Sequence, residues 1–329
     1  EAVTNKFDIS ETILMNQKNF SLIRNDYFDF RAAIGSDLWN NVLYVEILKN
    51  IKGKKIEIIK KNIENSIVSK QNNNLIFKNF LKKLVFKGLN LFQLFSRNTD
   101  AFIINSYLPI LDEIKLKLSL GQFPSIWRSP NVDKNVLQNL KLNREEFFIE
   151  FQNFDGIEKE VRRLINKLIP KCYIEGYESM CKQANKINWP SNPKFIYTSN
   201  NFTADEVFKF WLAFKVENGT PYYTGQHGAN YGTHYDSKNW TELNTADRFY
   251  SWGWKDIYPN TNVIPAFNFK IINKLNFSYD KCGKLLLVER STGTRDGVRD
   301  RYYENLVAQG DMKRFYGKLH KTNSRPIIS

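Results

Sequence analysis

The stretch "PKFIYTSNNFTADEVFKFWLAFKVENGTPYYTGQHG", residues 193–228, decides the fold class. Its short apolar run, residues 195–197, follows a proline-rich loop and is typical of a buried strand. Residues 203–206, "TADE", form a capping box, in which the Thr203 hydroxyl accepts from the Glu206 N–H, and this predicts a helix that begins there. The Asn218-Gly219 pair predicts the end of that helix, and residues 221–224 then predict a second strand.

A strand, a helix and a strand joined by connections of this length form a βαβ unit with parallel strands. Ligands of open parallel sheets bind at the carboxyl ends of the strands. Ser199 and Asn200 follow the first strand, and Gln226, His227 and Gly228 follow the second. We therefore expect an α/β fold with a ligand site at this edge.

His227 is the candidate for proton transfer. Imidazole exchanges a proton near neutral pH, and the neighbouring glycine lets backbone N–H groups approach a phosphate or sugar. The alternative is a turn histidine whose ring bonds a carbonyl. His234 follows the turn and is expected at the surface.

Asp247 in "ADRFYSWGW", residues 246–254, is a second candidate, as a base or as an acceptor for a sugar hydroxyl. Alternatively, Asp247 pairs with Arg248 or caps a turn, and Trp252 and Trp254 belong to an interface core.

A basic loop follows the apolar run at residues 284–289, which predicts a further strand. Arginines surround Gly293 and Gly297 there, and such a loop can hold a diphosphate by charge and by backbone donors. It is equally compatible with an exposed charged loop, since two aspartates offset part of the charge. The arginines are Arg290, Arg295, Arg299 and Arg301.

The composition is that of a globular protein of 329 residues, of which 42% are hydrophobic. No apolar run is long enough to cross a bilayer and no signal peptide opens the chain, so we expect a cytoplasmic protein. The three cysteines have spacings that favour neither disulfides nor zinc. The net charge of +14 is compatible with anionic lipid, nucleic acid or phosphorylated substrates, or with ordinary solvated lysines.

Helices are predicted elsewhere by apolar residues at helical spacing. They are expected at residues 38–48 and, with a break at Pro170, at residues 143–187. The lysine- and phenylalanine-rich stretch at residues 76–95 predicts a helix that packs in a bundle or lies on a membrane.

Four segments, "RAAIGSDLWNNVLYVEIL" (31–48), "PKFIYTSNNFTADEVFKFWLAF" (193–214), "GQHGANYG" (225–232) and "ADRFYSWGW", together resemble a family of bacterial transferases of surface-carbohydrate (O-antigen) biosynthesis. The resemblance covers residues 24–48 and 188–300. The sequence departs from the family at Ala229, where the family has a second glycine after its His-Gly pair.

The family is similar, more remotely, to capsule Kdo transferases and CDP-glycerol glycerophosphotransferases, which have the GT-B architecture. The resemblance implies an α/β, GT-B-like fold with Rossmann-like parallel sheets and a helical insertion, truncated at both ends. Residues 1–50 would be a remnant of the N-terminal Rossmann-like domain and residues 51–130 a basic helical insertion. Residues 131–275 would complete this acceptor-side domain, and residues 276–329 would begin the nucleotide-sugar domain.

The resemblance also implies a glycosyltransferase with a nucleotide-sugar donor and a glycan or lipid-linked glycan acceptor. The implied location is the cytoplasm, with peripheral association at the inner membrane as an option. Neither a metal nor a cofactor is expected, and no nucleic acid; an anionic membrane surface is a possible partner. The alternatives are a glycerophosphotransferase and a non-catalytic basic protein that binds nucleic acid or membrane. The residues expected to act are His227 and Asp247 in catalysis, Gln226, Gly228, Tyr231, Ser199, Asn200, Lys209 and Trp252 in substrate binding, and Arg290 and Arg295 at the donor phosphate.

Overall fold

A computed structural model of the protein describes residues 10–17, 20–49, 56–62, 93–133, 137, 144, 156–228, 231–232, 240–255, 262–272, 310–314 and 317. The chain divides into two compact units, Glu1–Ile272 and Asn273–Ser329. In the second unit the described residues, 310–314 and 317, are helical. The expected strand at 284–289 and the arginine loop after it lie outside the described residues.

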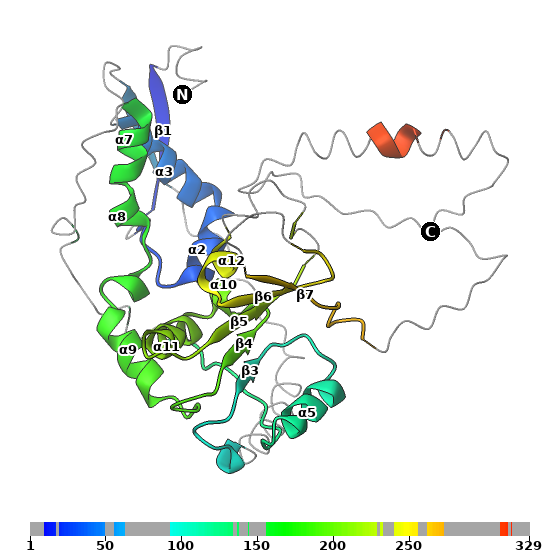
Figure 1. Cartoon of the computed structure of the whole chain (residues 1–329). Coiled ribbons are helices and arrows are strands. Elements are labelled where there is room, and N and C mark those ends of the chain that lie inside the picture. Colours follow the sequence, from blue (N-terminus) through cyan, green and yellow to red (C-terminus); the bar gives the residue numbers. More distant parts are fainter. Residues whose placement is uncertain are drawn as a thin grey trace, which may run out of the picture. The chain divides into compact units, whose positions relative to one another are not determined.

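A five-stranded sheet forms the centre of the first unit, and every neighbouring pair of strands is parallel (Figure 1). Because the strands are parallel, the carboxyl ends of all five lie at one edge of the sheet. The order of the strands across the sheet is their order along the chain. The strands are β3 (Phe102–Ile104), β4 (Ile196–Thr198), β5 (Tyr222–Gly225), β6 (Arg248–Ser251) and β7 (Val263–Pro265).

Helices α9 (Tyr177–Lys186) and α11 (Glu206–Glu217) cover one face of this sheet with a hydrophobic core. Successive strand residues alternate between the faces, so Phe102 points into this core. Its ring lies 4.6 Å from that of Trp211 and 4.7 Å from that of Trp189, measured between ring centroids. Aromatic burial of this kind supplies the main driving force for docking the helices.

The βαβ prediction is confirmed, because β4 and β5 are parallel neighbours joined by α11. The predicted start at Thr203 is wrong: a separate turn, α10 (Asn201–Ala204), contains Thr203, and the Asp205 carboxylate caps α11 by accepting from the Phe208 N–H. The predicted end is confirmed, with Asn218 as the C-cap and Gly219 at a φ of 82°, which favours glycine.

A second, two-stranded parallel sheet pairs β1 (Glu11–Asn16) with β2 (Glu57–Asn62). Two helices accompany it, α2 (Tyr27–Ile34) and α3 (Asp37–Lys49), and α3 confirms the helix expected at 38–48. Strand β1 precedes the segment 31–48. Strands β2 and β3 also lie within residues 51–130, where sequence patterns indicated only helices.

The remaining helices flank these sheets. Pro170 lies between two helices and so ends the helical pattern where the sequence predicted a break. Among the described residues no helix is long and apolar enough to cross a membrane. The bounds are η1 (Gln93–Phe95), α5 (Ile110–Ser119), α7 (Gly156–Arg163), α8 (Ile165–Leu168), η3 (Lys171–Tyr173) and α12 (Thr241–Thr245).

Candidate functional site

The carboxyl edge of the central sheet collects most of the residues that the sequence singled out. Asn105 follows β3, Ser199 follows β4, Gln226 and His227 follow β5, and Trp252 follows β6. The strands are parallel neighbours, so these residues stand in a row along one edge, as expected for a ligand site of an open sheet.

His227 is held by a hydrogen-bonded chain through Tyr231 to Glu242. The Tyr231 hydroxyl lies 2.7 Å from His227 Nδ1 and donates to the Glu242 carboxylate, on α12. Tyr231 and Glu242 are both buried. Because the tyrosine proton points to Glu242, the tyrosine oxygen faces His227 as an acceptor and favours the tautomer with its proton on Nδ1. In that tautomer Nε2 carries the lone pair, the form in which an imidazole acts as a base.

The surroundings of His227 lower the pKa of its imidazole below the ordinary value of 6.5. Burial is the largest cause, and the positive charge of Lys270 acts in the same direction, whereas the Glu242 charge and a hydrogen bond with the Ser199 backbone oppose it. The lowered pKa favours the neutral ring at pH 7, the form in which an imidazole acts as a general base.

Lys270 places a cation at this edge. Its ammonium donates to the His227 carbonyl over 2.8 Å and lies 4.2 Å from the centroid of the Tyr107 ring. The Trp252 ring is 5.9 Å away. Lys270 is exposed, so it can meet an anionic group of a ligand while remaining anchored to the backbone next to the imidazole.

Gln226 is buried and acts as a clamp between two strand ends. Its amide oxygen accepts from the Trp252 N–H over 2.7 Å and from the Trp254 indole over 2.8 Å, while its amide nitrogen donates to the Gly228 carbonyl over 2.7 Å. This side chain therefore fixes the loops on either side of His227. These bonds favour a positioning role, while a contact of Gln226 with substrate stays a prediction.

Ser199 and Asn200 join the end of β4 to the turn after β3. The Ser199 hydroxyl donates to the Ser106 carbonyl over 3.1 Å, and the Asn200 amide donates to the Tyr107 hydroxyl over 2.7 Å. Asn105 and Tyr107 adopt positive φ angles of 47° and 63°. Non-glycine residues rarely adopt such angles, and they concentrate at functional sites, where the surrounding structure enforces them.

Gly228 and Trp252 leave room and a donor at the same edge. A Cβ built on Gly228 would meet no atom within 4 Å, so this position faces open space. The indole N–H of Trp252 is buried and makes no hydrogen bond within the described part of the chain. Both features are compatible with the substrate-binding roles predicted for these residues.

Asp247 does not join this cluster. It precedes β6, and its carboxylate accepts from the Tyr222 N–H at the start of β5 over 2.7 Å. Because β5 and β6 are parallel, both groups lie at the amino edge of the sheet, opposite His227. The placement favours the alternative interpretation, in which Asp247 secures a chain turn, over the predicted catalytic role.

Lys209 lies on α11 and interacts with one residue of that helix and one of η3. Its ammonium is 3.1 Å from the buried Glu206 carboxylate and donates to the Tyr173 hydroxyl over 3.0 Å. These contacts leave it as part of the packing between α11 and η3. Ala229, His234, Arg290 and Arg295 lie outside the described residues.

Sequence reasoning missed Glu242, Lys270 and Tyr107. Glu242 carried one detectable signal, since it belongs to a short amphipathic segment directly before a strand, but glutamate on a helix is usually solvated. Lys270 and Tyr107 follow strands of three residues, which are too short for periodicity to reveal.

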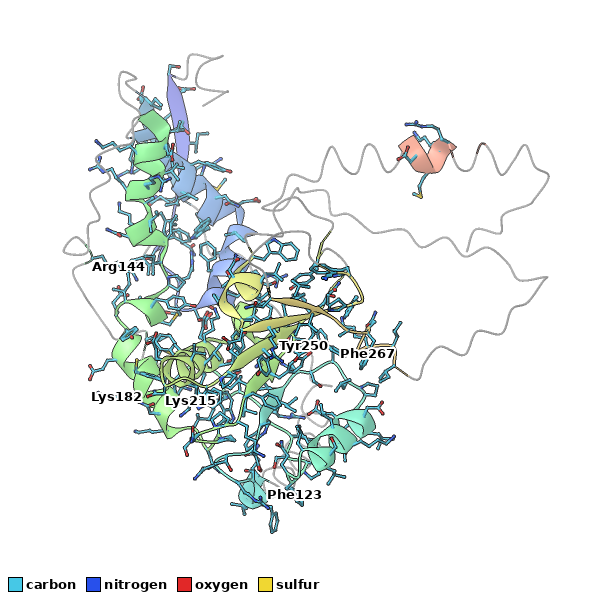
Figure 2. The ribbon with its side chains drawn as sticks, in the orientation of Figure 1. Phe123, Arg144, Lys182, Lys215, Tyr250 and Phe267 are labelled. Atoms are coloured by element: carbon cyan, nitrogen blue, oxygen red, sulfur yellow. The ribbon has the colours of Figure 1, made fainter. Side chains whose placement is uncertain are left out.

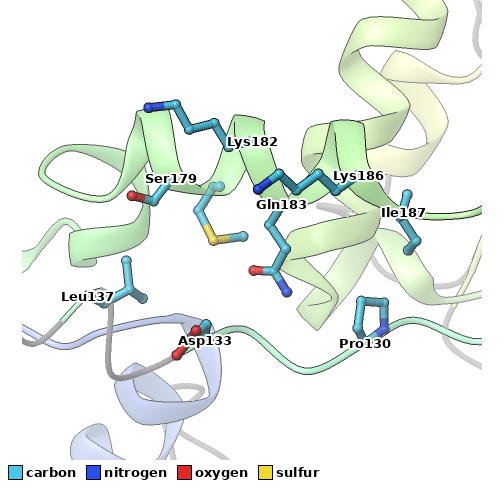
Figure 3. A pocket seen from close by; sticks show the side chains of 9 residues that line it. Pro130, Asp133, Leu137, Ser179, Lys182, Gln183, Lys186 and Ile187 are labelled. Atoms are coloured by element: carbon cyan, nitrogen blue, oxygen red, sulfur yellow. The ribbon is translucent and has the colours of Figure 1, made fainter.

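Cavities lie beside the carboxyl edge, on one face of the sheet and beside α9. A polar cleft of about 840 Å³ includes Asn105 and Asn200 of the carboxyl edge in its wall. An apolar cavity of about 610 Å³, lined by Tyr250 and Phe267 among others, lies on the sheet face opposite α11 (Figure 2). A third cavity of about 570 Å³ lies beside α9, with Lys182 and Lys186 among its lining residues (Figure 3).

No metal site accompanies the row of strand ends: the described ranges contain no group of three or more His, Cys, Asp or Glu side chains that could hold a metal ion.

Comparison with known proteins gives a family rather than a close relative. No curated protein and no solved structure matches the chain. The model of the LIC12162 family transferase matches residues 1–312, and the chain therefore belongs to this family of transferases.

Proposed function

We propose that this transferase is a glycosyltransferase that moves a sugar from a nucleotide-activated donor to a hydroxyl of a lipopolysaccharide, O-antigen or capsule acceptor. The observation that carries the proposal is the Glu242–Tyr231–His227 chain at the carboxyl edge of a parallel sheet. A base that takes the proton of the acceptor hydroxyl assists glycosyl transfer, and the place of His227 at the strand ends and its lowered pKa support this role.

In the proposed reaction His227 Nε2 takes the proton of the acceptor hydroxyl. The hydroxyl oxygen forms a bond to the anomeric carbon, and the bond from that carbon to the donor phosphate breaks with its electron pair on the phosphate. Tyr231 and Glu242 stabilise the imidazolium that results, because the carboxylate charge is carried toward Nδ1 through the tyrosine hydroxyl.

The leaving phosphate gains negative charge in this step, and cations lower its energy. Lys270 is suited to this role on the described unit, since its exposed ammonium is anchored to the backbone of the base itself. Arg290 and Arg295 stay predictions for the donor phosphate. The nucleotide sugar serves as co-substrate, and the proposal includes neither a metal nor a further cofactor.

The net charge of +14 supports a location at the cytoplasmic surface of an anionic membrane, where a lipid-linked acceptor would be presented. This peripheral association is part of the proposal. It predicts binding to anionic vesicles that weakens as the salt concentration rises.

A donor screen with the full chain tests the proposal. Thermal unfolding is followed with CMP-, UDP-, GDP- and dTDP-sugars, and the stabilising donor is then tested for nucleotide release with lipopolysaccharide or capsule extract as acceptor. A ligand that binds only the native state raises the melting temperature, so one nucleotide class should stand out. If no nucleotide sugar stabilises the protein and CDP-glycerol does, the protein is a glycerophosphotransferase instead.

A further inference from the structure

The polar cleft of about 840 Å³ beside the carboxyl edge lies within the size range of small-molecule sites, roughly 300–1,000 Å³. Its walls come from the ends of β3 and β4, the starts of α2 and α11, and the loop 129–133. It is therefore built by four segments of the chain, 26–28, 105, 129–133 and 200–206, that meet at the edge occupied by His227. The lining residues are Asp26, Phe28, Asn105, Ser129, Pro130, Asn131, Val132, Asp133, Asn200, Asn201, Ala204, Asp205 and Glu206.

The charge of this cleft is opposite to that of the protein. Four carboxylates line it, and its lining contains no lysine, arginine or histidine, although the chain carries a net charge of +14. The nearby cation of Lys209 is directed at Glu206 and Tyr173 instead. An anionic ligand would be repelled by these carboxylates and would find no cation in the lining, which disfavours phosphate and acidic sugars as occupants.

The carboxylates are also committed to the protein, which argues against a bare cation as the ligand. Asp26 caps α2 by accepting from the Asp29 N–H over 2.8 Å, and Asp205 caps α11 and accepts from the Asn201 amide over 2.7 Å. Glu206 accepts from the Tyr173 hydroxyl and pairs with Lys209. The charges of these three carboxylates are thus partly balanced by donors of the protein, and carboxylate oxygens in the wall are acceptors of the kind that suits hydroxyl groups.

Two further features favour a sugar ring. The Oδ1 atom of Asn200 is buried and accepts no hydrogen bond from the described part of the chain, and an unsatisfied buried acceptor is rare outside functional sites. Phe28 exposes 60% of its surface at the cleft wall, and an exposed aromatic face offers apolar contact to the C–H face of a sugar. Amides, carboxylates and an aromatic ring together match a ligand with many hydroxyls and one apolar face.

We infer that this cleft binds an uncharged hydroxylated sugar ring of the acceptor glycan and selects against acidic sugars. The inference rests on the proposed function, since it makes the cleft the acceptor subsite next to the proposed base. Asn200 connects the two parts, because it lines the cleft and donates to Tyr107, whose ring contacts Lys270.

Saturation-transfer NMR on the full chain tests the inference without a donor or turnover. The probes are the methyl pyranosides of glucose, galactose and mannose, each paired with its uronate, which differs only in carrying a carboxylate at C6. Saturation transfer is expected to at least one neutral glycoside and to be several-fold weaker for its uronate. No transfer to any neutral glycoside, or equal transfer to a uronate, would overturn the inference.

Matched aromatic variants place the binding in the cleft. Phe28→Ala is expected to weaken binding of the neutral glycoside by about three- to tenfold, because it removes the aromatic wall. Tyr44→Ala is the control, since Tyr44 on α3 is equally exposed at 62% and does not line the cleft. Equal effects of the two variants would place the glycoside elsewhere. If the wild-type protein binds the glycoside but transfers no sugar from any donor, the proposed function is refuted and the inference about the cleft is not.

Discussion

The Tyr231 hydroxyl lies 2.7 Å from His227 Nδ1 and donates its proton to Glu242. The two residues are separated in sequence by a segment that contains Ala229, the position at which the chain departs from the resembling family. The contact orients the imidazole of a histidine at a strand end, and Asp247, at the opposite edge of the sheet, takes no part in it.

Removing the tyrosine hydroxyl should lower the rate without weakening donor binding. Tyr231→Phe takes away the acceptor that favours the Nδ1–H tautomer, so kcat is expected to fall by about tenfold or more, while KM for the donor changes by less than about twofold. Steady-state kinetics with the stabilising nucleotide sugar check this. Tyr250→Phe, on the sheet face away from His227, is the control and should keep the wild-type kcat.

The pH dependence of the rate should follow the two charges around His227. Because the imidazole pKa is lowered, the acid limb of kcat/KM is expected below pH 6.5, with activity lost as His227 becomes protonated. Lys270 lowers this pKa, so Lys270→Met should move the limb to higher pH. Glu242 raises it, so Glu242→Gln should move the limb to lower pH. Shifts in the same direction in both variants would show that another group controls the limb.

Gln226 should matter for folding more than its small size suggests. Gln226→Leu leaves the half-buried backbone N–H of Trp252 and the Trp254 indole without their acceptor, and the free energy of unfolding is expected to fall by about 2–4 kcal/mol. Denaturant unfolding measures this. Gln183→Leu removes only one exposed hydrogen bond and should change stability by less than about 0.5 kcal/mol. A wild-type midpoint for Gln226→Leu would refute the clamp.

Substitution of Asp247 should lower the stability of the protein and leave the transfer rate nearly unchanged. Asp247→Ala removes the acceptor for the Tyr222 N–H at the amino edge, so we expect a stability loss of about 1 kcal/mol and a kcat within about twofold of wild type. Thermal unfolding and transfer are measured on the same preparation. A large loss of kcat with unchanged stability would restore a catalytic role for Asp247.

The sequence predicted the parts of the fold that local signals define. Residues 195–225 combine a proline-marked strand, a capped helix ended by Gly219 and a second strand, and each signal agrees with the others. The start of α11 was misplaced because "TADE" contains two possible N-caps, Thr203 and Asp205. Since Thr203 lies within the turn α10, Asp205 occupies the capping position of α11. Strand β3 has only three residues, and β2 is rich in lysine, so neither shows a strand period.

The site was predictable where a strand end can be read from the chain and unpredictable where distant segments meet. His227, Gln226 and Asn200 follow predicted strands, so their common edge could be expected. Their partners Glu242, Lys270 and Tyr107 reach them through tertiary packing from α12, the segment after β7 and the turn after β3. No local pattern marks Lys270 or Tyr107, and the weak signal of Glu242 does not distinguish it from a solvated helix residue. The position of Asp247 at the amino edge could not be predicted, because a motif gives residue order but not which edge of the sheet a residue occupies.

The most direct measurement compares His227→Gln with wild type in transfer of sugar from the stabilising donor, using the full chain and the same acceptor extract. If His227 is the base, kcat falls by about 100-fold or more, while the thermal stabilisation by the donor is unchanged. A transfer rate within about twofold of wild type would contradict the account, because the Glu242–Tyr231–His227 chain would then have no part in the reaction.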